Sequence, residues 1–355
     1  MKRILALIFA LCILLCACGK QPETPTTEAT EPVTEATEAT TEATEADVLR
    51  HPLNGTPLET PYTGRPTAIV LSNDPDALPQ HAISQADFIF EAATEGGITR
   101  LLAVFSDVAS VEGKIGPVRS ARSFFNSISR SLNAPIVHCG GSNWGINGYI
   151  DDTTKLQDWA HINEQQNGAY FYRDPERSNY LSWLNLFTNA EKLAKGLDKL
   201  GYVPETQKPV DYGFRFDEEV TLKGEAATKV TMNFSGSHTT KFQYDEETKQ
   251  YSASQYGKDH IDGNTGKAMT YSNVISLNTK QWGVYDGYYT RSFYTLVGEG
   301  AGHFATGGKI VPIKWSRATA EDPLVFTFED GTPITLRVGS TYVGIASDTV
   351  SMSYE

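Results

Sequence analysis

The chain has 355 residues, of which 40% are hydrophobic and 21% are charged, and its formal net charge is −13. This composition excludes an intrinsically disordered protein, a collagen and a polytopic membrane protein. The acidic balance also argues against a nucleic-acid partner, because the phosphate backbone of a duplex calls for a basic protein surface. At this length the chain can form two domains of ordinary size.

The amino terminus predicts export and a lipid anchor. A basic start precedes an apolar run over residues 4–15, which has the length of a secretory signal and is too short to span a bilayer as a helix. The run ends in Leu15-Cys16-Ala17-Cys18, which resembles the lipobox of bacterial lipoproteins. We expect a signal peptide over residues 1–17 and an acylated Cys18, with palmitate among its chains, at the outer face of the cytoplasmic membrane. A secreted protein without an anchor is the alternative.

Residues 18–61 are predicted to form a disordered tether. From residue 20 to residue 47 the chain repeats Thr-Glu-Ala and holds eight acidic residues, one lysine and no aromatic side chain. Such a segment buries too little apolar surface to offset its chain entropy, and its like charges extend it. Glutamate and alanine also favour a helix, but the frequent threonines and the charge repulsion weigh against one.

Residues 62–205 mix strand and helix patterns, which indicates an α/β domain. The expected elements are strands over 67–72, 86–94 and 98–105, a helix from Pro117, a strand over 135–138 and a helix over 188–200. The second and third strands form a hairpin around Gly96-Gly97, since paired glycines suit a two-residue turn. Proline favours the first position of a helix, and an apolar stripe follows Pro117 at helical spacing.

In residues 206–355 the sequence pattern differs, with short β-rich runs separated by turn signals. The expected strands lie at 230–234, 240–244, 250–254, 274–277, 288–297, 309–315, 324–328 and 334–338. Asp262-Gly263, Gly307-Gly308 and Asp330-Gly331 are strong turn signals. We expect a mostly antiparallel, all-β carboxy-terminal domain, so that the whole body belongs to the α+β class.

Several strings together resemble one family. The most specific are EAATEGGITR at residues 91–100 and IGPVRSAR at 115–122, and others include VHCGG at 137–141 and the stretches 251–266 and 300–315. They are similar to the YerB-like lipoproteins of Gram-positive bacteria, and the resemblance extends from Arg65 to the end of the chain. It implies export, exposure to the cell wall and paired amino- and carboxy-terminal domains of unknown function. The chain departs from the pattern at residues 178–188, which read SNYLSWLNLFT and lack an expected histidine.

The predicted hairpin and helix bring several charged residues together. With a two-residue turn, Glu91 pairs with Leu102, and strand alternation places Glu91, Glu95 and Arg100 on one face. Arg119 and Arg122 fall in the first turn of the helix expected from Pro117, where cations oppose the macrodipole.

A negatively charged group is therefore expected beside Arg119 and Arg122. Two alternatives remain open: an internal network with the glutamates, or an external anion bound by the arginines and the free N–H groups. The candidate ligand-binding cluster consists of Glu91, Glu95, Arg100, Arg119, Ser120, Arg122 and His138.

No catalytic, metal or cofactor motif is recognised. His138 and Cys139 are consecutive strand residues on opposite faces, so they cannot form a thiol–imidazole dyad, and Cys139 is expected in the core. His161 and Glu164 give H-x-x-E without the second histidine of a zinc-protease helix. We expect no cofactor and no metal. Only Cys139 remains in the mature body, so no intrachain disulfide is expected either.

Two functions are compatible with these residues. The first is a binding or scaffolding lipoprotein whose partner is an anionic small molecule, an envelope glycan or a protein. The second is a hydrolase of an anionic envelope substrate, with Glu91 or Glu95 as general acid or base. Four residues of strand separate the two carboxylates by about 13 Å, beyond the roughly 5–9.5 Å that glycosidases use. The sequence therefore favours the binding function.

Overall fold

The computed structural model describes residues 48–141, 159–202, 205–206, 208–348 and 352–355. The predicted signal peptide, Cys18 and residues 19–47 of the predicted tether lie outside this part of the chain. Residues 48–61, which the sequence assigns to the tether, contribute to the folded body, because Leu53 is completely buried and Asn54 donates a hydrogen bond to Asp87 at 2.6 Å. Within the described residues, no helix has the length and apolar character needed to cross a membrane.

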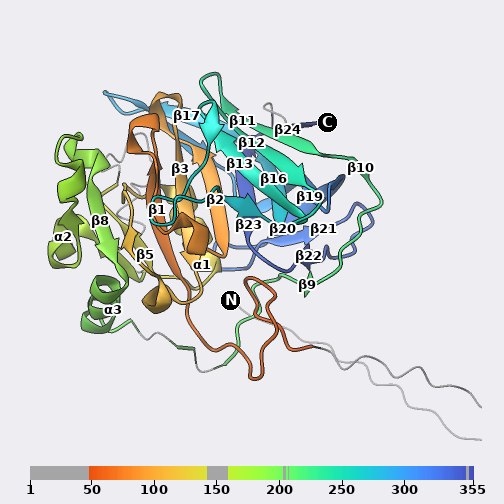
Figure 1. Cartoon of the computed structure of the whole chain (residues 1–355), viewed down its shortest axis with the longest axis horizontal. Coiled ribbons are helices and arrows are strands. Elements are labelled where there is room, and N and C mark those ends of the chain that lie inside the picture. The colour runs from red at the N-terminus through yellow and green to blue at the C-terminus, as the bar shows by residue number, and fades with distance from the viewer. Residues whose placement is uncertain (1–47, 142–158, 203–204, 207, 349–351) are drawn as a thin grey trace, which may run out of the picture. The chain divides into compact units, whose positions relative to one another are not determined.

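A mixed sheet of eleven strands takes residues from both predicted domains (Figure 1). In spatial order it contains β10 (Glu225–Ala226), β20 (Lys309–Arg317), β19 (Gly298–Thr306), β16 (Asn273–Thr279), β23 (Thr341–Ser347), β2 (Phe88–Ala93), β3 (Thr99–Phe105), β1 (Thr67–Asn73), β5 (Ile136–His138) and β6 (His161–Asn163), and β21 (Val325–Thr327) pairs with β20. Strand β23 pairs in parallel with β2 on one side and with β16 on the other. The two predicted domains therefore share one sheet, and the described residues belong to one compact unit.

A second sheet of six strands comes from the carboxy-terminal half alone. It contains β14 (Lys258–Asp259), β13 (Gln250–Gln255), β12 (His238–Asp245), β11 (Lys229–Ser235) and β24 (Met352–Tyr354), and β15 (Thr270–Tyr271) pairs with β13. Its pairings are antiparallel, as the sequence predicts for this half. The smaller sheets are β17 (Gln281–Tyr285) with β18 (Thr290–Tyr294), β9 (Phe216–Asp217) with β22 (Leu336–Arg337), and β4 (Lys114–Ile115) with β8 (Leu186–Asn189) and β7 (Tyr172–Arg173).

Helices are few beside these sheets. The α-helices of the described part are α1 (Ser123–Ser131), α2 (Glu164–Asn167) and α3 (Ala190–Lys199). Short 3₁₀ turns are η1 (Pro75–Ala77), η2 (Ile83–Gln85), η3 (Glu95–Gly97), η4 (Val108–Ser110), η6 (Gly168–Tyr170), η7 (Pro175–Arg177) and η8 (Ser182–Leu184). Sheet with a small number of helices agrees with the predicted α+β class.

Both faces of the central strands are buried, which explains their nearly continuous apolar sequences. One face of β1, with Ile69, belongs to the same apolar core as Met232 and Phe242 of the second sheet. The opposite face, with Val70, belongs to a separate core that includes Ile128 of α1. Strand alternation thus assigns each apolar residue of β1, β2 and β3 to one of two cores.

The structure contains the expected hairpin of β2 and β3 but corrects its register. Glu91 pairs with Leu101, one residue away from its expected partner. The reason is the turn η3, which spans three residues instead of two, with Gly96 and Gly97 both at positive φ. Because successive strand residues face opposite sides, this shift places Glu91 and Arg100 on opposite faces of the sheet.

The helix expected from Pro117 begins only at Ser123, with Arg122 as its N-cap. The segment before it is extended, and the N–H of Arg119 donates to the backbone oxygen of Val70 in β1 at 2.8 Å. Proline has no N–H to donate and a fixed φ, so it suits the entry to an extended segment as well as the start of a helix. Arg119 is therefore outside the helix, and Arg122 lies at its boundary.

Candidate functional site

Arginines from three parts of the chain surround the carboxylate of Glu95. We call this set the arginine cluster, and its members are Arg100, Arg119, Arg122, Arg291 and Glu95. Arg100 and Arg291 each place a guanidinium nitrogen near Oε1 of Glu95, at 3.0 and 2.9 Å. Arg122 binds both carboxylate oxygens, through Nη2 and Nε. The β2–β3 turn, the segment before α1 and strand β18 thus meet at one carboxylate.

The arginines keep Glu95 ionised. Burial raises the pKa of this carboxyl, but the charges of Arg100 and Arg122 outweigh burial and hold the pKa far below its ordinary value. A carboxylate bound by three guanidinium groups does not take up a proton near neutral pH, so it is unsuited to general acid–base catalysis. Its role in this geometry is to hold the arginines in place.

Arg119 is the one arginine of the cluster without an ion pair to Glu95. Its backbone is fixed, since its carbonyl oxygen accepts a hydrogen bond from the N–H of Cys139 at 3.0 Å. Among the residues that the structure describes, its partly buried guanidinium has no hydrogen-bond or ion-pair partner. Burial and the charge of Arg122 lower its pKa, against the opposing charge of Glu95. Arg119 is therefore a cation whose charge is incompletely balanced.

Ser120 and His138 complete the predicted candidates. Ser120 takes part through its backbone oxygen, which accepts a hydrogen bond from Arg100 at 3.0 Å. His138 is buried in β5, where Nδ1 donates to the backbone oxygen of Gly140 at 2.7 Å and the ring lies 5.7 Å from that of His161. Burial lowers the pKa of His138 to about 4, so the ring is neutral at physiological pH. These contacts give His138 a structural role.

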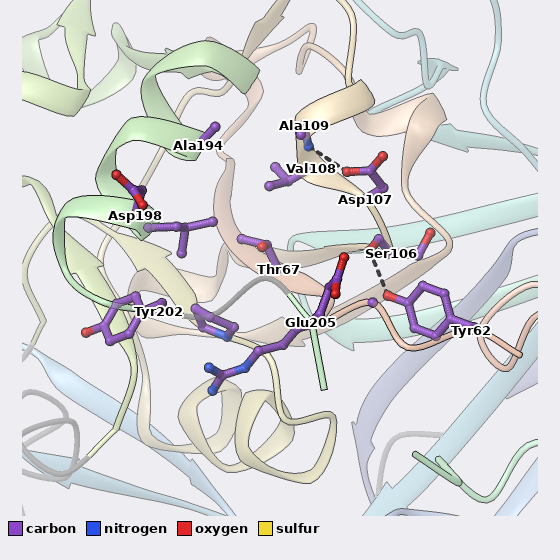
Figure 2. A pocket seen from close by; sticks show the side chains of 14 residues that line it. Tyr62, Thr67, Ser106, Asp107, Val108, Ala109, Ala194, Asp198, Tyr202 and Glu205 are labelled. Atoms are coloured by element: carbon purple, nitrogen blue, oxygen red, sulfur yellow. Dashed lines mark hydrogen bonds between the residues drawn. The ribbon is translucent and has the colours of Figure 1, made fainter. Parts of the chain in front are cut away.

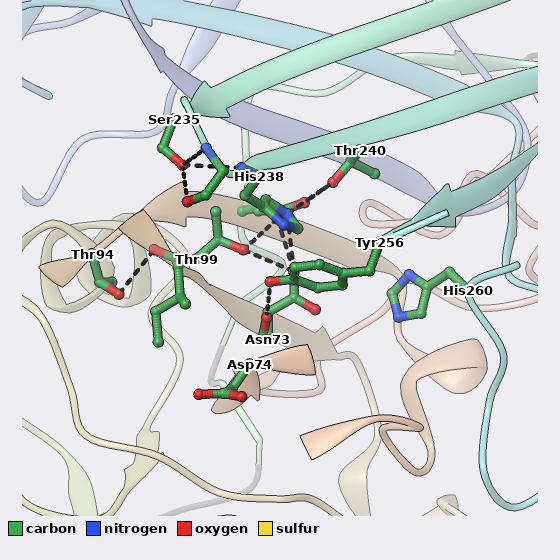
Figure 3. A network of polar contacts seen from close by, with 12 residues as sticks. Asn73, Asp74, Thr94, Thr99, Ser235, His238, Thr240, Tyr256 and His260 are labelled. Carbon is green, nitrogen blue, oxygen red and sulfur yellow. Dashed lines mark hydrogen bonds and ion pairs between the residues drawn. The ribbon is translucent and has the colours of Figure 1, made fainter. Parts of the chain in front are cut away.

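Glu91 does not belong to the arginine cluster, and its expected place beside Arg100 is wrong. It lies on the opposite face of the main sheet, in a buried polar network with Asn73, Thr99, His238 and Thr240, which are labelled in Figure 3. The side chain is 1% exposed. It accepts hydrogen bonds from Asn73, Thr99, His238 and Thr240 at 2.5–2.9 Å and from the hydroxyl of Tyr342. The one-residue register shift moves Glu91 from one face of the sheet to the other.

The Glu91 network joins the two halves of the chain. Asn73 and Thr99 come from the first predicted domain, whereas His238, Thr240 and Tyr342 come from the second. Burial raises the pKa of Glu91, but the charge and hydrogen bond of His238, with the hydroxyl donors, outweigh it and lower the pKa to about 2. A fully bonded and buried carboxylate is closed to an external ligand.

A cavity of about 490 Å³, whose wall is drawn in Figure 2, shares no lining residue with either network. Its wall includes Tyr62, whose hydroxyl donates to the backbone oxygen of Ser106 at 2.7 Å, and Arg65, which binds the backbone oxygen of Asn133. The wall also carries the carboxylates of Asp107, Asp198 and Glu205. None of the predicted candidate residues lines it, and carboxylates outnumber guanidinium groups there, so it does not suit an anion.

Sequence reasoning predicted a strand over 288–297, which contains β18, but it missed β17 and the place of Arg291 in the site. Arg291 lies 5.1 Å from the ring centroid of Tyr289, and its Nε donates to the carboxylate of Asp286 at 2.5 Å. The sequence does show a turn signal at Asp286-Gly287. Nothing local connects that turn with Glu95, because the contact joins residues that are far apart in the chain.

Comparison with known proteins places the chain in a family. The amino-terminal domain model of DUF3048, a protein of unknown function, matches residues 53–203, and the carboxy-terminal domain model matches residues 230–343. The predicted domain boundary at 205/206 falls between these segments. The chain is 26% identical over 313 residues to a Bacillus subtilis (strain 168) protein named "Putative lipoprotein YerB", which covers 85% of this chain and 88% of that protein.

The fold supports the same assignment. The crystal structure of YerB from Bacillus subtilis matches with a TM-score of 0.72 at 25% identity, over 86% of this chain and 99% of that chain. Sequence and fold thus agree across both halves of the body. The chain belongs to the YerB-like family and carries its paired DUF3048 amino- and carboxy-terminal domains.

Proposed function

We propose that this protein is a cell-surface lipoprotein that binds a carboxylate- or phosphate-bearing ligand at the arginine cluster. The observation that carries the proposal is the guanidinium of Arg119, which has no hydrogen-bond or ion-pair partner in the described part of the chain. Guanidinium groups bind carboxylates and phosphates through paired N–H donors. An anion beside Arg119 would offset the repulsion from Arg122.

The surroundings of Arg119 favour an anion over a cation. Arg119 lies near the positive charge of Arg122, which lowers the pKa of Arg119, so a further cation would be repelled there and an anion attracted. Helix α1 begins directly after Arg122, and among the described residues no side chain caps its amino terminus. Free N–H groups and the macrodipole favour negative charge at such an end.

The hydrolase alternative has less support from the geometry. Glu95 is bound by three arginines, and Glu91 is buried with five hydrogen-bond donors on another face of the sheet. Cys139 donates to Glu164 at 3.2 Å, and burial raises its pKa to about 11, so it remains a thiol. These three groups are therefore poorly suited to act as a general base or nucleophile.

We also assign the site to the outer face of the cytoplasmic membrane of a Gram-positive cell, where Cys18 carries the lipid and the body faces the cell wall. The lipobox-like sequence and the name of the Bacillus subtilis relative support this location. Anionic groups of small molecules, envelope glycans and proteins all occur in this environment.

Thermal melts with and without an anion test the proposal. Phosphate should stabilise the wild-type protein, by about 2.7 kcal/mol when its concentration is 100 times the dissociation constant. Arg119→Ala should leave stability without phosphate unchanged or slightly higher, because it removes a repelled cation, and should abolish the phosphate effect. Arg215→Ala is the matched control, since Arg215 is an exposed arginine that pairs with Asp211, and it should keep the phosphate effect.

The opposite pattern would mean that Arg119 is a structural residue. The proposal fails if phosphate, sulfate and acetate all leave the wild-type melting temperature unchanged while Arg119→Ala lowers it. A phosphate effect that survives Arg119→Ala in full would place the anion elsewhere on the protein and would equally contradict this site.

A further inference from the structure

The tip of the β17–β18 hairpin exposes tyrosines beside the arginine cluster. Tyr285, Tyr288 and Tyr289 have 64%, 71% and 56% of their surface exposed, more than any other large hydrophobic side chain in the described residues. The hairpin that contains β17 projects at the upper left of the body in Figure 1, beside the turn that leads into β3. A group of aromatic side chains with this exposure marks an interaction surface.

Hydrogen bonds within the tip fix its shape. The carboxylate of Asp286 accepts from the N–H groups of Tyr288 and Tyr289 at 2.9 and 2.8 Å. The hydroxyl of Tyr285 donates to the backbone oxygen of Gly287 at 2.8 Å. A tyrosine presented on a fixed backbone offers a large contact area and loses little conformational freedom on binding.

Arg291 joins the tip to the arginine cluster. It packs on the ring of Tyr289, binds Asp286 within the tip and reaches Glu95 at the centre of the cluster. Tyr294, at the end of the same hairpin, donates to the backbone oxygen of Ala93 next to the β2–β3 turn at 3.1 Å. Arg291 and Tyr294 therefore hold the tyrosine tip beside the arginine cluster, in which Arg100 and Arg122 are buried and Arg119 and Arg291 are partly exposed.

We propose that the tip and the arginine cluster form a docking surface for a partner protein that presents an acidic segment. The proposal rests on the anion site above and names its ligand as a side-chain carboxylate of that partner. Tyrosine and arginine are the residues in which binding energy concentrates at protein interfaces. In this arrangement the partner's carboxylate meets Arg119 while its apolar surface receives the tyrosines.

The exposure of the tip favours a protein over a free small molecule or a sugar strand. Small ligands are held in concave sites, which bury most of their surface. A projecting tip needs a partner that supplies the concave side, and a folded protein does so. Complementary charge at the base of the tip adds specificity and speeds association.

Site-specific photo-crosslinking of the full-length protein in living cells tests this surface. Tyr288 is replaced by p-benzoyl-phenylalanine, and Tyr180, an exposed tyrosine on another part of the body, is replaced in the same way as the control. We expect a discrete protein adduct from position 288 only, with a contact segment that contains Asp or Glu. Arg119→Glu should weaken the adduct by about tenfold or more, and a lysine at the mapped acidic position should restore it.

Other outcomes overturn the proposal. A diffuse adduct that muramidase removes would identify a sugar polymer as the ligand, and the absence of any adduct would mean that the tip has no stable partner. An adduct that is indifferent to Arg119→Glu would separate the tip from the arginine cluster. If phosphate still protects the purified protein through Arg119 in these cases, the docking surface fails and the anion site stands.

Discussion

At the scale of single residues, Glu91 is a buried carboxylate that is stabilised entirely by buried hydrogen-bond donors. Its carboxylate accepts five hydrogen bonds, which satisfy both oxygens. Removing the charge from such a site leaves several donors without an equivalent acceptor. The effect reaches both halves of the chain, because the donors come from both.

We expect Glu91→Gln to lower the free energy of unfolding by about 3–5 kcal/mol at neutral pH. The folded pKa of about 2 lies below the ordinary value of 4.5, so the stabilisation is complete above pH 4.5 and is lost as the pH falls through 2. Urea denaturation over this pH range should show the wild-type and mutant curves converging in acid. A pH-independent difference would contradict the electrostatic origin, and Glu246→Gln on the surface should show no comparable loss.

At the scale of elements, periodicity predicts most strands of this fold but not their faces or their order. The alternating runs of β11, β12 and β13 are evident in the sequence, because each buries every second residue. The register of β2 and β3 depends on whether the turn uses two residues or three, and Gly96-Gly97 is compatible with both. That single ambiguity separates Glu91 from Arg100. The sequence therefore identifies Glu95 and three arginines of the arginine cluster, but it wrongly adds Glu91 and misses Arg291.

Strand β19 escapes sequence prediction because it is rich in glycine, which lowers strand propensity. The structure explains the glycines by close packing: a Cβ at Gly302 would lie 2.1 Å from the backbone oxygen of Ser276 in β16. We expect Gly302→Ala to force the two strands apart and to cost about 1–3 kcal/mol or more in urea denaturation. Gly236→Ala is the control, because that position has open space around it. Equal stability of both variants would argue against this packing.

At the scale of the whole molecule, the segments that match the two family domain models, residues 53–203 and 230–343, are interlocked. Strand β23, near the carboxyl terminus, lies between β2 and β16, and the Glu91 network adds polar contacts across the same junction. The sequence pattern indicates an α/β segment followed by a β-rich segment. It cannot show that a strand near the carboxyl terminus pairs with a strand near the amino terminus. Such long-range pairing depends on the packing of the complete body.

The interlocked body also includes residues that the sequence assigns to the tether. A chain that starts at residue 48 should melt like the full-length protein, whereas one that starts at Tyr62 should melt several degrees lower. The buried side chain of Leu53 alone contributes about 1.5–3 kcal/mol, and each kcal/mol shifts the melting temperature by roughly 2–4 °C in domains approaching this size. Leu53→Ala in the longer chain should reproduce much of the loss. If the two shortened chains have equal melting temperatures, residues 48–61 belong to the tether. If the chain from residue 48 melts below the full-length protein, the tether itself stabilises the body.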